Sequence, residues 1–281
     1  MASPSPIFLL DLFPQLDHRL IELLRLLSPD DWNRPTVCRG WSVKDIASHL
    51  LDGNFRRIAL NRDGYQSPEK PVITSYRDLV DHLNQLNADW VIATRRLSPA
   101  ILIDLLEQTG QQVYDAFRQL PPYEQAIFPV GWAGEETSPN WFDIAREYTE
   151  RWHHQQQIRL AVSQPGNLLS RPFYFPLLDT FMRALPHSYR TVQAPEGTTV
   201  RVSVTGDGGG VWIIERQPTR WAFVPAPEQV IQPTASVTID GPMAWRLFTK
   251  GLNRSEALAH LRFEGDLMLT QTILDMTAVM A

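Results

Sequence analysis

Residues 40–50 read Gly40-Trp41-Ser42-Val43-Lys44-Asp45-Ile46-Ala47-Ser48-His49-Leu50, and this stretch predicts the start of an amphipathic helix. Ser42 is the expected N-cap residue, and Asp45, three positions later, completes a capping-box pattern. Apolar residues follow on related faces, so His49 lies among core-facing positions about two turns into the helix. A histidine in this place is either a hydrogen-bonded structural residue or a metal ligand.

A second stretch with ligand-type residues reads Glu150-Arg151-Trp152-His153-His154, in a helix predicted over about residues 138–162. The i,i+4 spacing puts Glu150 and His154 on one helix face, whereas His153 is expected about 100° away from His154 and off that face. With His49, two imidazoles and one carboxylate from two helices could form a three-ligand metal site with room for water or substrate. The alternative is an ordinary hydrogen-bonded pair, because such i,i+4 pairs are common on helices.

The first part of the chain, to about residue 165, is predicted to be helical throughout. Helical periodicity covers residues 7–27, the region that follows Ser42, and residues 76–97, 99–120 and 138–162. Several long helices with moderate connections indicate a bundle, and the core of a bundle is a common place for metal sites. We therefore assign residues 1–165 to a metal-binding helical bundle.

The second part has a different pattern. A helix is expected over residues 175–185, followed by strands at 198–205, 211–215, 221–224, 236–239 and 261–264. Gly206-Asp207-Gly208-Gly209-Gly210 is the expected turn of the first hairpin. Helices are expected over residues 242–250 and 266–281. Residues 166–281 are thus predicted to form a smaller α+β domain with an antiparallel sheet and helices on one side.

Composition limits the classes of function. A net charge of −5 at pH 7 argues against a nucleic-acid-binding protein, which would normally carry a basic stripe. The apolar run at residues 7–10 is too short for a signal peptide or a membrane span, and no other segment is suitable. Cys38, the one cysteine, cannot form an internal disulfide and is expected to be a small core residue. We therefore expect a cytoplasmic protein with no membrane or nucleic-acid partner.

Four blocks of sequence resemble a known family. Residues 40–45 with His49-Leu50 resemble the first characteristic block of the DinB-like superfamily and, more narrowly, of the mycothiol-dependent maleylpyruvate isomerase family. In the second half, the blocks at residues 181–186, 237–245 and 263–266 resemble the family's carboxy-terminal domain, which is similar to sterol-carrier proteins. The resemblance implies an α+β protein with an N-terminal DinB-like four-helix bundle and a smaller C-terminal sterol-carrier-like domain. It also implies that His49, Glu150 and His154 bind a divalent metal, usually zinc.

One position departs from the family pattern. The family often has an aspartate three residues after the second histidine, whereas Gln157 stands there in this chain. Groups that hydrogen-bond to metal ligands orient them and tune the metal, so metal affinity and substrate are expected to differ here.

The resemblance implies a divalent-metal-dependent isomerase or S-transferase that uses a low-molecular-weight thiol on a small electrophilic substrate. Two histidines and a carboxylate suit Zn²⁺, and also Ni²⁺, Fe²⁺ or Mn²⁺. The alternatives are a metal-dependent hydrolase and a non-catalytic protein that binds a lipid or another small molecule. Arg56, Arg57 and Arg151 are candidates for binding a substrate carboxylate. The sequence assigns no further catalytic residue, no substrate and no oligomeric state.

Overall fold

A computed structural model describes residues 5–67, 71–224 and 232–279. They fall into two compact units, which we call the helical unit and the sheet unit. The helical unit comprises Phe8–Ile127 and Glu150–Gly166, and the sheet unit comprises residues 5–7, Phe128–Thr149 and Asn167–Val279. The division of the chain into a metal-binding helical bundle over residues 1–165 and an α+β domain over residues 166–281 stays a prediction.

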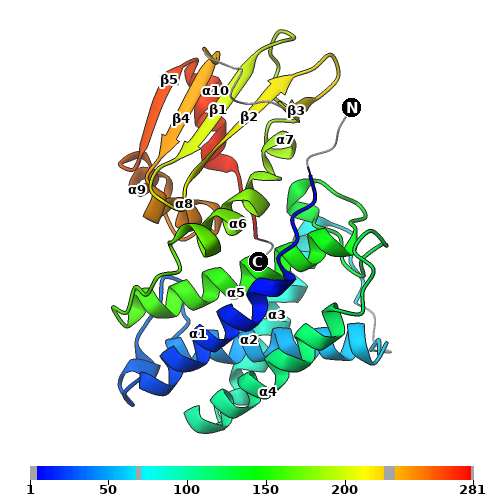
Figure 1. The fold of residues 1–281 in the computed structure, drawn as a ribbon, viewed down its shortest axis with the longest axis vertical. Helices are drawn as coiled ribbons and strands as arrows, with labels where there is room; N and C mark the ends of the chain where they lie inside the picture. The colour runs from blue at the N-terminus through cyan, green and yellow to red at the C-terminus, as the bar shows by residue number, and fades with distance from the viewer. Residues whose placement is uncertain (1–4, 68–70, 225–231, 280–281) are drawn as a thin grey trace. The chain divides into compact units, whose positions relative to one another are not determined.

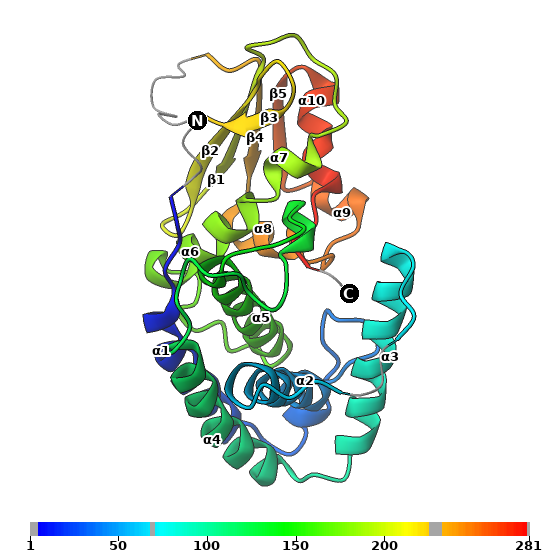
Figure 2. The same cartoon turned by 90° about the vertical axis from the view of Figure 1, so that its right-hand side faces the viewer.

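Among the described residues, the helical unit contains four complete α-helices and part of a fifth, and their arrangement is drawn in Figures 1 and 2. Their bounds are α1 (Phe13–Leu26), α2 (Val43–Arg57), α3 (Tyr76–Thr94), α4 (Pro99–Phe117) and α5 (Asn140–Ala161), of which the part from Glu150 onward belongs here. Short 3-10 turns cover Leu10–Leu12 and Asp31–Asn33, and a π-helical segment, Ile58–Arg62, continues α2. The predicted helical character of this part of the chain is confirmed.

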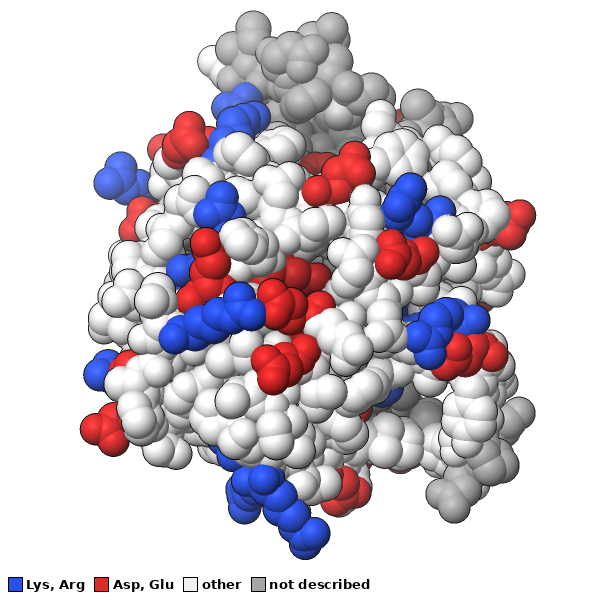
Figure 3. Space-filling view, turned by 60° about the horizontal axis from the view of Figure 1, so that its bottom comes forward, with Lys and Arg blue, Asp and Glu red and all other residues white. Residues whose placement is uncertain are grey.

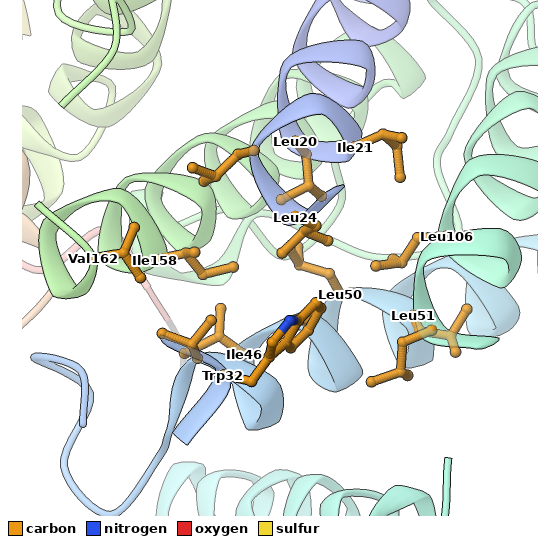
Figure 4. Packing of buried hydrophobic residues seen from close by; sticks show 14 residues of the cluster. Leu20, Ile21, Leu24, Trp32, Ile46, Leu50, Leu51, Leu106, Ile158 and Val162 are labelled. Carbon is orange, nitrogen blue, oxygen red and sulfur yellow. The ribbon is translucent and has the colours of Figure 1, made fainter. Parts of the chain in front are cut away.

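Helices α1, α2, α4 and α5 share one hydrophobic core, shown in Figure 4. It includes Leu24 of α1, Ile46 of α2, Leu106 of α4 and Ile158 of α5, all buried. Burying one aliphatic side chain of this size contributes roughly 1.5–3 kcal/mol to the free energy of folding. The shared core therefore holds the four helices together. Helix α3 packs against α2, where the indole of Trp90 donates to the Ser48 carbonyl at 2.8 Å.

The start of α2 has the predicted capping box. The Asp45 amide donates to the Ser42 hydroxyl at 3.3 Å, and the Ser42 amide donates to the Asp45 carboxylate at 2.9 Å. Both bonds satisfy backbone donors that an uncapped helix would leave open. This reciprocal pair fixes where α2 begins, and therefore where His49 lies along it.

The sheet unit is built on a five-stranded sheet with the order β3-β2-β1-β4-β5. Its strands are β1 (Thr199–Val204), β2 (Gly210–Arg216), β3 (Trp221–Phe223), β4 (Ala235–Ile239) and β5 (Leu261–Gly265). Antiparallel pairs join β1 to β2, β2 to β3 and β4 to β5, but β1 and β4 are parallel. The expectation of a purely antiparallel sheet was therefore wrong. β4 pairs with the edge of β1 that β2 leaves free and runs in the same direction as β1, and two parallel strands need a crossover connection.

Helices α7 (Leu185–Ser188) and α10 (Leu267–Gln271) pack on one face of this sheet (Figures 1 and 2). The unit also contains α6 (Arg171–Met182), α8 (Gly241–Phe248), α9 (Arg254–Leu258), the first part of α5, and 3-10 turns at Gly131–Ala133 and Thr272–Asp275. The predicted alternation in β1 is present, since Val200, Val202 and Val204 are all buried. The α+β class predicted from the sequence is confirmed.

The closing helix is shorter than predicted. It was expected over residues 266–281, but α10 ends at Gln271, and a 3-10 turn follows; residues 280–281 lie outside the described part of the chain. The β-branched residues Thr270, Thr272 and Ile273 weaken helix propensity at that point. The strand-like continuation gains a tertiary contact instead, because the Ala278 amide donates to the Phe248 carbonyl at 2.9 Å. Helices α7 and α9 were not predicted, because four or five residues are too few to show a helical period.

Among the described residues, no helix combines the length and the apolar character that crossing a membrane requires. On the face drawn in Figure 3, acidic and basic side chains are interspersed.

Candidate metal site

Helix α2 places His49 at the edge of the helical core. Its neighbours Ile46 and Leu50 are buried in that core, while the His49 side chain is half-buried. The His49 ring lies between two others, with centroids 5.0 Å from Trp41 and 4.8 Å from His154. The predicted approach of α2 and α5 at this point is therefore present in the structure.

Helix α5 contributes three ligand-type residues to the same place. One ligand atom from each of Glu150, His153 and His154 lies within 4.8 Å of the other two. The Nε2 atom of His154 is 3.6 Å from the Glu150 carboxylate, and both imidazoles are buried. A carboxylate and two imidazoles at this spacing form a donor set suitable for a divalent first-row metal.

His153 was misplaced by the sequence analysis. It was expected off the Glu150 face, but the structure puts it in the same cluster. Residues three apart on a helix are neighbours just as residues four apart are, and Glu150 and His153 have that spacing. The signal was thus present in the sequence. His49 is not in this compact group, although its ring contacts that of His154.

Gln157 holds His154 in one orientation. The His154 Nδ1 atom lies 2.9 Å from the Gln157 side-chain oxygen. An amide oxygen only accepts, so this bond assigns a proton to Nδ1; a neutral His154 ring would then have its lone pair on Nε2, the atom that faces Glu150. Gln157 therefore makes the kind of hydrogen bond that orients metal-ligating histidines, with an uncharged acceptor where the family often has a carboxylate.

The environment of His49 favours its neutral form. Burial is the main cause that holds the pKa of His49 well below its usual value of 6.5. The positive charges of a protonated His154 and of Arg56 lower this pKa further. Among the described residues, the buried Nδ1 atom of His49 has no hydrogen-bond partner. Buried polar atoms are nearly always paired, so this imidazole nitrogen, beside three ligand-type residues, has an unused bonding position.

The comparisons with known proteins point to one family. Residues 13–159, just over half of the chain, match the sequence profile described as "Mycothiol maleylpyruvate isomerase N-terminal domain". The chain belongs to this family. A comparison with curated proteins found no match.

Solved structures support the fold of this family member. It resembles crystal structures of the mycothiol-dependent maleylpyruvate isomerase, in a histidine-to-alanine mutant (TM-score 0.54) and in the enzyme described without a mutation (TM-score 0.50). Both are 14% identical to it, and each match covers 92% of this chain and 92% of the other. At that identity the similarity establishes the fold alone.

In this family member the three candidate arginines have different surroundings. Arg151 donates to Asp17 at 2.8 Å and to Asn54 at 2.5 Å, so it joins α5 to α1 and α2 inside the bundle. Arg57 is buried, with its guanidinium 5.5 Å from the centre of the Phe117 ring. Arg56 alone of the three has a substantially exposed side chain, at 43%.

Cys38 is half-buried, and burial raises the pKa of its thiol. It packs against the helical core with Trp41. A raised pKa disfavours the thiolate, which fits the predicted role as a small core residue rather than a nucleophile.

Proposed function

We propose that the chain is a divalent-metal-dependent isomerase or S-transferase that uses a low-molecular-weight thiol on a small electrophilic substrate. The observation that carries the proposal is the cluster of Glu150, His153 and His154 beside His49. The family membership and the similarity to the structures of a mycothiol-dependent maleylpyruvate isomerase support a thiol as the second reactant.

The residues present fit a metal ion. We propose His49, Glu150 and His154 as its ligands, which gives two neutral imidazoles and one carboxylate, the kind of set that open catalytic sites use. The unpaired Nδ1 atom of His49 and the oriented Nε2 atom of His154 are the imidazole nitrogens that would bind the ion. His153 is the competing third ligand, because it lies in the compact cluster and His49 does not. We propose zinc first, with nickel, iron and manganese compatible with the same donors.

A divalent metal held by these residues would lower the pKa of a coordinated thiol, so that the thiolate would form at neutral pH. The chain's own residues supply the surroundings for that reactant. Gln157 holds the His154 ring in place, and the Trp41 ring lies against the His49 ring, with 5.0 Å between the ring centroids. A thiolate that adds to a conjugated double bond permits rotation about it and then leaves, which is isomerisation. A thiolate that displaces a leaving group stays attached, which is transfer.

The proposal includes a cytoplasmic location, which a single free cysteine supports, since secreted proteins more often contain disulfides.

The test begins with metal content. The purified protein, with and without added Zn²⁺, Ni²⁺ or Mn²⁺, is measured beside His49→Ala, Glu150→Ala, His153→Ala and His154→Ala variants. His18→Ala is the matched control, because His18 forms an exposed i,i+4 pair with Glu22 at 3.2 Å, the same residue types far from a cluster. Circular dichroism establishes that each variant is folded.

We expect about one equivalent of metal in the parent protein, in His18→Ala and in His153→Ala, and loss of metal in the other three. Loss in His153→Ala with retention in His49→Ala would replace His49 by His153 in the ligand set. Absence of metal from the parent under all conditions would overturn metal dependence and favour the non-catalytic binding protein. The loaded protein is then assayed for isomerisation of maleylpyruvate with added thiols, and turnover of esters or amides without thiol would favour the hydrolase instead.

A further inference from the structure

We propose that strand β5 pairs with β5 of a second copy of this chain, so that the two five-stranded sheets become continuous across a two-fold axis at Phe263. This association is separate from the proposed metal chemistry, because β5 and the helices beside it belong entirely to the sheet unit.

The two edges of the sheet differ. Strand β3 ends the sheet on one side and has three residues, which offer little backbone to a further strand. Strand β5 ends it on the other side and has five residues. Figure 1 shows β5 at this edge, and among the described residues β4 is the only strand that pairs with it. An open strand edge of this kind is a template for another strand.

Hydrogen bonds at the end of β4 show which of its residues face β5. The Asp240 amide donates to the His260 carbonyl at 3.0 Å, on the β5 side. The Ile239 carbonyl accepts from the Thr205 amide at 3.0 Å, on the β1 side. In an antiparallel pair, residues that bond to the partner strand alternate with residues whose backbone faces away from it. Asp240 and His260 are therefore a hydrogen-bonded pair, and the next pair along the ladder is not.

The same alternation identifies the outward backbone groups of β5. Ile239 lies opposite Leu261, and Val237 lies opposite Phe263, so both of these are non-hydrogen-bonded pairs. The N–H and C=O groups of Leu261 and Phe263 therefore point away from β4, toward the open edge. About a two-fold axis at Phe263, the Phe263 residues of two copies would lie opposite each other and exchange hydrogen bonds through these outward groups.

The charges of β5 are self-complementary about the same axis. Arg262 and Glu264 flank Phe263, are both exposed, and lie on one face of the sheet because side chains alternate along a strand. When Phe263 lies opposite its copy, Arg262 of each chain lies opposite Glu264 of the other. Directly opposed unlike charges stabilise a strand pair, and like charges destabilise it. Antiparallel registers centred on Arg262 or on Glu264 would put like charges opposite each other, so charge favours the register centred on Phe263.

Apolar side chains adjoin this open edge. Helices α9 and α10 both pack against β5. They leave Leu258, Leu267 and Met268 exposed, at 45%, 62% and 70%. Covering such side chains removes apolar surface from water and favours association. A second copy of the chain supplies the opposing strand, the complementary charges and the same apolar side chains together.

The test is sedimentation equilibrium of the purified protein over a range of concentrations. The variants are Arg262→Glu, Glu264→Arg and the double variant with both changes, which exchanges the two charges. Arg77→Glu is the matched control, because the Arg77 side chain on α3 is 90% exposed and lies in the helical unit, where the substitution makes the same change in charge. Circular dichroism establishes that each variant is folded.

We expect the parent protein and Arg77→Glu to dimerise with the same dissociation constant. Each single reversal in β5 is expected to raise that constant at least about tenfold, because the two-fold axis turns both opposed pairs into like charges. The double variant is expected to return it to within about threefold of the parent value, since unlike charges again lie opposite each other.

A parent protein that stays monomeric at every concentration at which it is soluble would overturn the proposal. A dimer that both single reversals leave intact would also overturn it, because the interface would then lie elsewhere. The same holds for a double variant that dimerises as weakly as the single variants do, since the opposed charges would then not define the register.

Discussion

Removing the carboxylate of Asp17 is expected to destabilise the helical unit strongly. Asp17 of α1 accepts from Arg151 of α5, whose side chain is only 7% exposed, while that of Asp17 is 20% exposed. Breaking a buried ion pair from one side typically costs about 3–5 kcal/mol, because a charge stays buried without its partner. The partial exposure of Asp17 reduces this figure, so we expect the free energy of unfolding to fall by about 2–3 kcal/mol in Asp17→Ala.

The assay is urea unfolding followed by circular dichroism, with Asp17→Ala, Arg151→Met and the double variant. The double variant removes both charges of this pair, so neither is left buried without its partner. It is therefore expected to be at least about 1 kcal/mol more stable than the sum of the two single effects predicts. Glu107→Ala is the control, because Arg25 and Glu107 join α1 to α4 at 2.6 Å with both side chains more than half exposed. That exposed pair is expected to contribute less than about 1 kcal/mol. A loss in Asp17→Ala as small as in the control, or strict additivity in the double variant, would refute the reasoning.

Three further predictions follow from individual contacts. Gln157→Leu is expected to weaken Zn²⁺ binding about 10–100-fold, because a ligand loses its orienting hydrogen bond; an unchanged dissociation constant in a competition titration would contradict this. Replacing a glycine inside a helix by alanine usually raises the free energy of unfolding by about 1 kcal/mol. Gly110→Ala is expected to lower it instead, as measured by urea unfolding, because the new Cβ atom would lie 2.8 Å from the Asp17 carboxylate. A stabilised variant would show that α4 can shift to make room. Burial raises the pKa of Tyr174 and of Tyr189 above the ordinary value of 10.0, so the unfolded chain loses these protons first. The contribution of these two tyrosines to the free energy of unfolding is therefore complete below about pH 10 and falls as the pH rises above it. In Tyr189→Phe, the free energy of unfolding is expected to fall less steeply with pH above about pH 10 than in the parent protein.

The helical half of the fold was predictable because its signals are local. The capping box at Ser42 and the helical spacing of apolar residues mark α2 without reference to the rest of the chain. The strand positions were also predictable from alternation, but alternation identifies faces and not neighbours. The parallel pairing of β1 with β4 depends on how the chain returns after β3, and no residue pattern encodes that return.

The sequence predicted that the candidate site consists of histidines and a carboxylate, but it identified only some of the residues that lie together there. The spacing of Glu150 and His154 predicted their proximity, which the structure shows, while their role as metal ligands stays a prediction. His153 shares the cluster through an i,i+3 relation that the sequence already contained. Arg56 and Arg57 are adjacent and point about 100° apart around α2, yet only Arg57 contacts the Phe117 ring of α4. This difference could not be predicted, because the sequence does not say which face of α2 packs against α4.

The sheet unit combines the separate segments Phe128–Thr149 and Asn167–Val279, and this has a consequence for synthesis on the ribosome. Trp132 and Phe142 contact each other, and Trp132 also contacts Phe181, which follows Phe142 by about forty residues. At typical rates of about 5–20 residues per second, the earlier segment waits roughly 2–8 seconds for Phe181 to be made, and longer for the strands. During that interval its aromatic side chains have no native core to enter. A nascent chain paused before residue 180 should therefore expose a site that chaperones bind, even though the core residues of α1, α2 and α4 have already been made.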